Sequence, residues 1–180
     1  MLLVGLLLAG VFYAIFPSLR GAVNEWALGV KNRVESYFPQ YDPVRPTSVT
    51  ATDELPDHPA ELAADGFKNT FWVAPDAAAQ PTLELEFDRP TDLVRAIVYA
   101  GGGEDFQALG RPRQLNLVYF AEDTVIGTAD VTLNDTPEPQ EVEFGGGDGA
   151  TRVEIQVMSF NRSVQNPGLA LSEIELFERQ

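Results

Sequence analysis

The chain has 180 residues, of which 44% are hydrophobic, with a net charge of −15 and no cysteine. The apolar content excludes disorder of the whole chain, and the lack of cysteine excludes disulfides and thiolate zinc sites. Residues 1–38 hold three basic and two acidic side chains, so nearly all of the negative charge lies beyond them. Because this acidic part repels phosphate backbones, we expect no binding to nucleic acid.

Residues 1–19 predict a transmembrane anchor. The run from Met1 to Phe16 carries no charge, and Arg20 is the first charged residue. A helix of about 19 residues is roughly 28 Å long, close to the thickness of a bilayer's hydrocarbon core. The alternative is a cleaved signal peptide, which would begin with basic residues and end at a small-x-small cleavage site. The basic start is missing and the nearest cleavage candidate, around Gly21, fits poorly.

The orientation of this anchor depends on few charges. The basic residues near it follow it within residues 20–38, and the positive-inside rule applied to them alone would leave the rest of the chain in the cytoplasm. A basic segment upstream of Met1 would reverse that orientation. We expect a single-pass membrane protein whose following domain lies outside the cytoplasm.

Residues 20–38 predict an amphipathic stalk helix. An apolar stripe recurs at steps of three and four residues, with charged residues on the opposite face. The stripe consists of Leu19, Val23, Trp26, Val30, Val34 and Tyr37. Such a helix could lie on the bilayer, pair with a copy of itself, or pack on the domain. Three prolines in residues 39–46 then end the helix and stiffen a linker, so the domain should begin at Thr47.

Residues 47–180 predict an all-β domain. Short runs of alternating or β-branched residues are separated by glycine- and proline-rich turns, a pattern typical of a sandwich or barrel. Strands are expected at residues 82–87, 93–99, 115–120, 125–133, 141–144, 153–158 and 174–177. The glycine runs at 101–103 and 145–147 are interpreted as turns, and one short helix is expected from Pro59 to Ala64.

Three segments resemble discoidin-like domains, which are also described as coagulation-factor type C-like and galactose-binding-like. His58 to Trp72 (HPAELAADGFKNTFW) resembles the opening motif of that family, Pro81 to Tyr99 the next two strands, and Ala170 to Glu178 the closing strand. The resemblance covers residues 47–180. It implies an eight-stranded antiparallel jelly-roll β-sandwich with its first and last strands close together, and it places Trp72 in the core.

The segment Pro43 to Pro46, following an apolar run and a short helix, is similar to a bacterial subset of this family. That subset is the glycan-binding domain found beside a bacterial NAD glycohydrolase, and Arg111-Pro-Arg113 also fits it. The resemblance implies a non-catalytic module that binds carbohydrate or a cell-envelope polymer outside the membrane. The alternative is a scaffold domain that docks a protein partner. A pocket lined by aromatic rings and arginine would favour the first hypothesis, and a flat apolar patch the second.

The family resemblance also implies a possible structural calcium ion beneath the Asp-Gly loop. Asp65 and Glu173 match acidic positions of that site, and Thr70 matches an oxygen donor. Calcium takes six to eight oxygen ligands, whereas Phe67 stands where relatives often place Asp or Asn. We therefore expect no calcium and no other cofactor. The alternative role of Asp65 is to cap the turn by accepting hydrogen bonds from backbone N–H groups.

Two loops, at residues 101–113 and 160–167, predict a ligand site. They concentrate the aromatic rings, guanidinium groups and amides that suit sugar hydroxyls. The expected ligand-binding residues are Phe106, Arg111, Arg113, Asn161, Arg162 and Gln165. The alternative is that the arginines pair with acidic neighbours such as Glu104 and Asp105.

No catalytic constellation is recognisable in the sequence. His58 is the only histidine and lies in a turn just before Pro59. Without cysteine there can be no Cys–His pair, and no serine sits in a nucleophile-elbow motif. Most carboxylates alternate along strands, which is typical of a solvated face. We therefore expect a protein that is not an enzyme.

Overall fold

A computed structural model describes residues 40–102 and 106–179 of this chain. The chain divides into two units, Met1–Gln40 and Tyr41–Gln180. The anchor expected at residues 1–19 and the stalk expected at residues 20–38 lie outside the described residues. Within the described part, no helix is long and apolar enough to cross a membrane.

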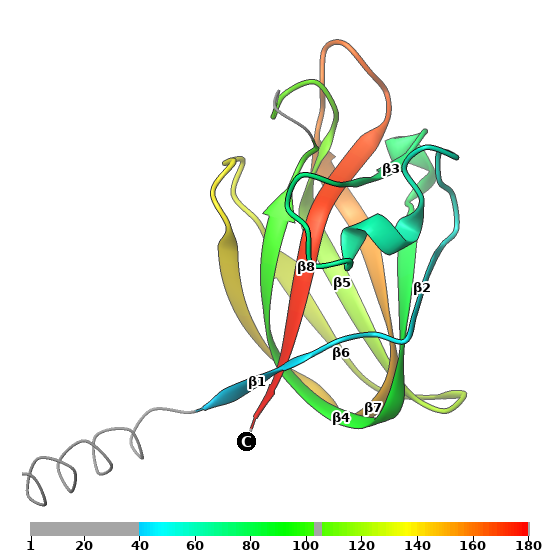
Figure 1. The fold of residues 1–180 in the computed structure, drawn as a ribbon, viewed down its shortest axis with the longest axis vertical. Coiled ribbons are helices and arrows are strands. Elements are labelled where there is room, and N and C mark those ends of the chain that lie inside the picture. Colours follow the sequence, from blue (N-terminus) through cyan, green and yellow to red (C-terminus); the bar gives the residue numbers. More distant parts are fainter. Residues whose placement is uncertain (1–39, 103–105, 180) are drawn as a thin grey trace, which may run out of the picture. The chain divides into compact units, whose positions relative to one another are not determined.

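The described domain is an eight-stranded antiparallel β-structure, as the sequence predicted (Figure 1). The strands are β1 (Tyr41–Val44), β2 (Ser48–Ala51), β3 (Trp72–Ala74), β4 (Thr82–Ala100), β5 (Arg111–Ala121), β6 (Thr124–Thr132), β7 (Gln140–Asn161) and β8 (Leu169–Arg179). Two short 3-10 helices, η1 (Ala60–Ala63) and η2 (Ala77–Ala79), flank β3. The strands pair in the order β1-β8-β4-β7-β5-β6, with β2 added to β4 and β3 added to β8.

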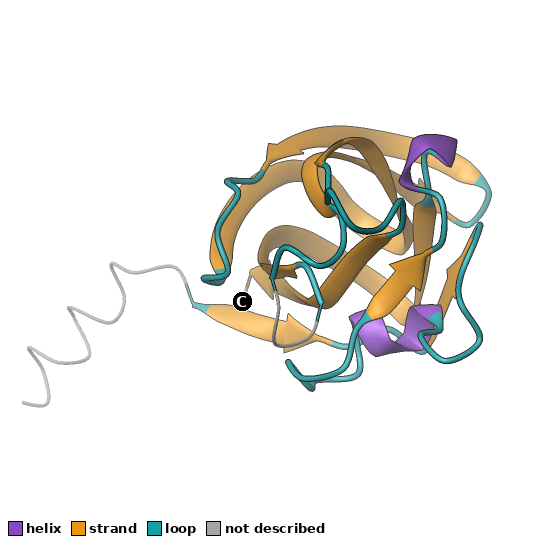
Figure 2. Ribbon diagram, turned by 90° about the horizontal axis from the view of Figure 1, so that it is seen from above, coloured by secondary structure: helices purple, strands orange, loops and turns teal. Residues whose placement is uncertain are grey.

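The two longest strands, β4 and β7, bend and take part in both layers. The first half of β4 pairs with β2, and its second half pairs with β8. Strand β7 follows β4 through this bend with register shifts between Glu86 and Arg95. Figure 2 shows, from above, how the curved strands wrap around the interior.

Glycines at the bend allow the strands to approach closely. A Cβ atom on Gly147 would lie 2.8 Å from the Leu93 carbonyl oxygen, and one on Gly127 would lie 2.3 Å from that of Gly146. Gly146 also has a φ of +89°, a conformation that favours glycine. The expectation of a turn at residues 145–147 is therefore wrong: this glycine run lies inside β7. The two strands expected on either side of it are one continuous strand, as are the two expected within β4.

The core fills the space between the layers with alternate side chains from the strands. Leu83, Leu85 and Phe87 of β4 are buried, as period-two alternation requires. Trp72 is fully buried, and its Nε1 donates a hydrogen bond to the Asp53 carbonyl oxygen at 3.2 Å. The predicted core position of Trp72 is confirmed.

Strand β1 lies inside the segment that we expected to be a linker. Tyr41 to Val44 pair with Leu176 to Arg179 at the end of β8, so first and last strands are adjacent. Pro43 is compatible with this strand because β1 is at an edge of the sheet order. The Arg95 guanidinium carbon lies 4.9 Å from the centroid of the Tyr41 ring. The domain therefore begins at Tyr41 and not at Thr47.

Removing β1 tests this boundary. A chain beginning at Gln40 should unfold with a free energy about 1–3 kcal/mol higher than one beginning at Thr47, because the shorter chain loses the β1 backbone hydrogen bonds and the Tyr41–Arg95 contact. Urea titration followed by tryptophan fluorescence measures the difference. Equal midpoints and slopes for the two chains would show that β1 contributes nothing to the fold.

Candidate functional site

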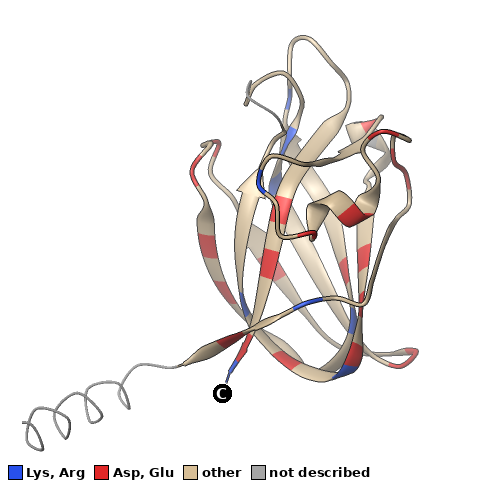
Figure 3. Cartoon of the chain, viewed as in Figure 1, with Lys and Arg blue, Asp and Glu red and all other residues tan. Residues whose placement is uncertain are grey.

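Loops from three parts of the chain meet at the end of the domain opposite β1 (Figure 1). They join β3 to β4, β4 to β5, and β7 to β8. Backbone hydrogen bonds link the last two: Gly110 N–H donates to Gly168 O at 2.8 Å, and Ala170 N–H donates to Gly110 O at 2.9 Å. Figure 3 shows acidic positions along the strands, and basic positions both near these loops and at the opposite end of the domain. The loop end therefore brings together segments that are far apart in the sequence.

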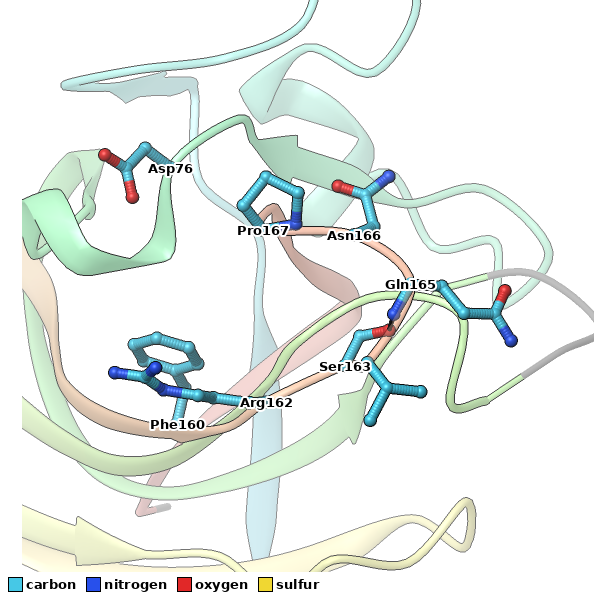
Figure 4. A pocket seen from close by; sticks show the side chains of 8 residues that line it. Asp76, Phe160, Arg162, Ser163, Gln165, Asn166 and Pro167 are labelled. Atoms are coloured by element: carbon cyan, nitrogen blue, oxygen red, sulfur yellow. Dashed lines mark hydrogen bonds between the residues drawn. The ribbon is translucent and has the colours of Figure 1, made fainter.

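A cavity of about 340 Å³, here called the first cavity, opens between the β3–β4 and β7–β8 loops (Figure 4). Its lining residues are Asp76, Phe160, Arg162, Ser163, Val164, Gln165, Asn166 and Pro167. Asp76 lies across the opening from Phe160 and Arg162 in Figure 4. The volume suits a small polar ligand.

Hydrogen bonds hold the β7–β8 loop in shape. Ser163 Oγ donates to the Ala108 carbonyl oxygen at 2.9 Å and accepts the Gln165 N–H at 3.0 Å. Asn166 Oδ1 accepts the Gly168 N–H at 2.9 Å. The wall of the first cavity is thus fixed before any ligand binds.

The first cavity combines an aromatic ring, a cation and two amides. The Arg162 guanidinium carbon lies 5.8 Å from the Phe160 ring centroid, and the Arg162 side chain is exposed. Gln165 and Asn166 carry exposed amide groups. Guanidinium and amide groups donate hydrogen bonds to hydroxyl or carboxylate oxygens, and Asp76 can accept them from hydroxyl groups. This chemistry suits a polyhydroxylated ligand such as a sugar.

Of the six residues expected to bind a ligand, only Arg162 and Gln165 line the first cavity. Asn161 ends β7 opposite Arg111, and Arg113 is exposed on β5. The sequence-based prediction missed Asp76, which follows β3 in the sequence, and Asn166. Asn166 does lie within the loop predicted to bind.

Arg111 is buried, with only 5% of its surface exposed, and it holds the loop end together. Its Nε and Nη2 donate to the two carboxylate oxygens of Asp135 at 2.8 and 2.7 Å, and its Nη1 donates to the Leu109 carbonyl oxygen at 3.1 Å. The Phe106 ring centroid lies 5.1 Å from the Arg111 guanidinium carbon. The hydrogen bonds from Arg111 lower the pKa of Asp135. Arg111 therefore has partners within the protein, and the half-buried Phe106 ring lies beside it.

The expected calcium residues do lie together, but their oxygens already accept hydrogen bonds. Asp65 Oδ1 accepts the Phe67 N–H at 2.7 Å, and Asp65 Oδ2 accepts the Thr70 hydroxyl at 2.8 Å. Glu173 Oε2 accepts the Gly66 N–H at 3.0 Å. Phe67 contributes an exposed ring and no side-chain oxygen.

This arrangement does not fit a calcium ion. N–H and O–H groups point at the carboxylate oxygens that would have to face the cation, and calcium needs six to eight oxygen ligands. Over residues 40–102 and 106–179, no group of three or more His, Asp or Glu side chains is placed to hold a metal. The hydrogen bond from Phe67 N–H to its neighbour two residues back supports the capping role of Asp65.

Burial of the Glu173 carboxyl group raises its pKa above the usual range of a glutamate. The side chain lies in β8 and only 2% of the residue is exposed. The pKa of Glu173 is raised to about 7: burial is the largest cause, the Gly66 N–H opposes the rise, and the nearby Asp65 and Glu175 carboxylates add to it. Glu173 therefore keeps its proton in the folded state at a pH where an exposed glutamate has lost it.

No family model matches the sequence, and no curated protein matches it. Solved structures do resemble the domain. The F5/8 type C domain of a Bacteroides fragilis protein is 18% identical, with 78% of this chain and 97% of that chain covered and a TM-score of 0.62. The family 32 carbohydrate-binding module of C. perfringens NanJ, solved with galactose, is 15% identical over 77% of this chain and 100% of that chain, with a TM-score of 0.64.

A Streptococcus pneumoniae fucose binding module is 14% identical, with 75% of this chain and 93% of that chain covered and a TM-score of 0.56. At these identities the likeness concerns the fold. The described domain thus has the discoidin-like fold of F5/8 type C domains and family 32 carbohydrate-binding modules, as its sequence motifs predicted.

The two arginines of the Arg-Pro-Arg segment should differ in their effect on stability. Arg111→Ala should lower the free energy of unfolding by about 1–3 kcal/mol, because it leaves Asp135 and the Leu109 carbonyl without their donors. Arg113→Ala should change it by less than about 0.5 kcal/mol, as is usual at exposed positions. Denaturant titration of both variants measures the two values. Similar losses in both would contradict the assigned role of Arg111.

The Glu173 titration should appear in the pH dependence of stability. Since the folded state binds this proton more tightly than the unfolded state, the free energy of unfolding should fall as pH rises from about 4.5 to about 7. Glu173→Gln keeps an oxygen to accept the Gly66 N–H and should remove this fall. Thermal unfolding at several pH values measures it, with Glu138→Gln, at an exposed position between β6 and β7, as the control that keeps the wild-type slope. A Glu173→Gln profile parallel to the wild type would contradict the raised pKa.

Proposed function

We propose that this chain is a non-catalytic, membrane-anchored module that binds carbohydrate or a cell-envelope polymer at its loop end. The observation that carries the proposal is the first cavity, where Phe160, Arg162 and two amides lie together across from Asp76. Aromatic rings stack on the apolar faces of sugars, while guanidinium, amide and carboxylate groups bind hydroxyls. Solved neighbours with this fold were crystallised with galactose or are named for fucose binding, which supports a sugar as the ligand.

The position of the first cavity suits presentation from a membrane. The chain enters the domain at β1, which pairs with the last residues of β8, whereas the loops lie at the start of β8. Eleven residues of β8, at about 3.3 Å each, separate the two ends by roughly 35 Å. A domain tethered through residues 1–19 would carry its sugar site at the end away from its point of attachment. The extracytoplasmic location and the likeness to the bacterial glycan-binding subset are parts of the same proposal.

A protein-docking role is the second candidate. Strand β6 ends the sheet order and carries exposed apolar side chains, with Val125 53% and Ile126 39% exposed. Edge strands with apolar residues can pair with a strand from another protein. This surface lies on a different strand from the first cavity, so the two roles can be tested separately.

A glycan array probed with the full chain in lipid nanodiscs tests the proposal. Arg162→Ala should weaken binding of the captured glycan by about 1–3 kcal/mol, the usual contribution of a charge-assisted hydrogen bond. Arg179→Ala is the matched control, because Arg179 is exposed in the terminal strand at the far end of the domain. An array without any bound glycan, or equal affinities for both variants, would contradict a sugar site in the first cavity.

A further inference from the structure

Strand β1 is the first part of the domain that the chain forms after residue 40. Its residues Tyr41 to Val44 pair antiparallel with the end of β8, and Tyr41 lies opposite Arg179. The chain therefore enters the domain beside its own last strand, at the end away from the loops (Figure 1). Just before β2, the Thr47 N–H donates to the Glu86 carbonyl oxygen at 2.8 Å. A force that reaches the domain along the chain from residue 40 thus acts on β1 before it acts on any other strand.

The side chain of Tyr41 connects β1 to strands beyond β8. Its hydroxyl donates a hydrogen bond to Glu143 Oε1 in β7 at 3.2 Å, and its ring centroid lies 4.9 Å from the guanidinium carbon of Arg95 in β4. That carbon also lies 5.5 Å from the ring centroid of Phe177 in β8, and the guanidinium group forms an ion pair with Glu141 of β7. Side chains from β8, β4 and β7 therefore all support the attachment of β1.

The register decides how tension acts on the pair of β1 and β8. The hydrogen bonds of an antiparallel pair run perpendicular to the strands. Tyr41 lies at the end of β8, whereas the loops lie at the start of β8. Tension between the loop end and residue 40 therefore runs along both strands and loads all of their hydrogen bonds at once, as a shear force.

The opposite case is tension between residue 40 and the C-terminus. Because Tyr41 and Arg179 are neighbours in the register, this tension pulls the two strands apart from one end. The hydrogen bonds then break one after another, and each break needs little force. The same four residue pairs thus resist a pull from the loop end much better than a pull from the C-terminus.

We infer that β1 is a mechanical clamp, which resists tension between a tether before residue 40 and a ligand held at the loop end, and which the side chains of Tyr41 and Arg95 strengthen. The inference rests on the proposed function for the source of this tension. A tethered module that holds a polymer is pulled along this direction whenever the polymer moves relative to the membrane. A strand of only four residues serves this purpose because its bonds must break together.

Pulling single molecules in two directions tests the clamp. The sequence contains no cysteine, so two introduced cysteines serve as the only attachment points for thiol-linked handles. Gln40→Cys is combined with Val164→Cys, at a fully exposed position of the loop end, or with Gln180→Cys at the C-terminus. The full chain is used, and loading at residue 40 bypasses residues 1–39, so the result does not depend on whether these residues insert into a membrane.

Optical tweezers measure the force of the first rupture. Detachment of β1 frees residues 41–46, which lengthens the chain by at most roughly 20 Å and so distinguishes this step from unfolding of the whole domain. The force should be at least about twice as high for the loop-end pull as for the C-terminal pull, because four residue pairs break together in the first and singly in the second. This comparison leaves every residue of β1 unchanged.

Variants of the supporting side chains test their contribution under the loop-end pull. Tyr41→Ala should lower the rupture force, and Tyr41→Phe, which keeps the ring beside Arg95 but loses the hydrogen bond, should give an intermediate value. Val131→Ala is the control, because Val131 is buried in β6, at the opposite end of the strand order from β1. It should lower the Tm through lost core contacts but leave the force of the first rupture unchanged.

The outcomes separate this inference from the proposed function. Equal forces for the two pulls, an unchanged force in Tyr41→Ala, or an equal loss of force in Val131→Ala would overturn the clamp, while the sugar-binding function stands. An array without any bound glycan would overturn the sugar-binding function and, with it, the role of the clamp, even where the two forces differ.

Discussion

The bend that β4 and β7 make together is the constraint on which the rest of the domain depends. Both strands change partners along their length, so each belongs to both layers of the sandwich. Such a bend brings backbones closer than a side chain allows. Gly127 and Gly147 permit this approach because glycine has no Cβ atom. A strand that continues through the bend keeps its backbone hydrogen bonds paired, whereas a turn at the same place would leave some of them to water. The two layers are therefore joined by continuous chain and enclose one core.

This arrangement gathers the loops that carry the candidate binding residues at one end of the domain. The layers close over Trp72 and the alternating leucines, and the connections between strands are left to form the surface of the loop end. Backbone hydrogen bonds between Gly110 and the segment Gly168 to Ala170, and the Arg111–Asp135 pair, hold these connections in position. Loops on a rigid scaffold can carry a binding site without strain in the core. The first cavity follows from this arrangement, because it is lined by segments that the strands bring to the same end.

The carboxyl groups of this domain lie in two different environments, exposed along the strands or buried at Glu173. Along the strands the carboxylates are mostly solvated, and Arg152 shows a local exception, with Glu84 and Glu154 each within 2.8 Å of its guanidinium group. At Glu173 a carboxyl group is buried beside another, and its pKa rises because both burial and the neighbouring charge disfavour ionisation. Hydrogen bonds from the Gly66 N–H, the Phe67 N–H and the Thr70 hydroxyl to these two carboxyl groups hold the Asp-Gly turn.

The sequence by itself determined the fold class, most strand positions, the buried Trp72 and the loop in which Arg162 and Gln165 lie. These features are local: alternation of apolar and polar residues indicates the buried face of a strand, and Trp72 stands at the end of a short motif that resembles one with a core tryptophan.

Only the tertiary structure decided that Gly145 to Gly147 continue a strand, because a glycine run in a sequence is equally compatible with a turn and with a close approach of two backbones. The sequence also did not predict that Tyr41 to Val44 pair with β8. Prolines in this segment indicate a linker, and the strand that it pairs with lies more than 130 residues further along the chain. Likewise, the sequence indicates a surface position for Arg111, whereas folding brings Asp135 to it. Asp76 and Arg162 come to line one cavity although more than eighty residues separate them in the chain. Burial and partnership are set by long-range packing, which local patterns do not record.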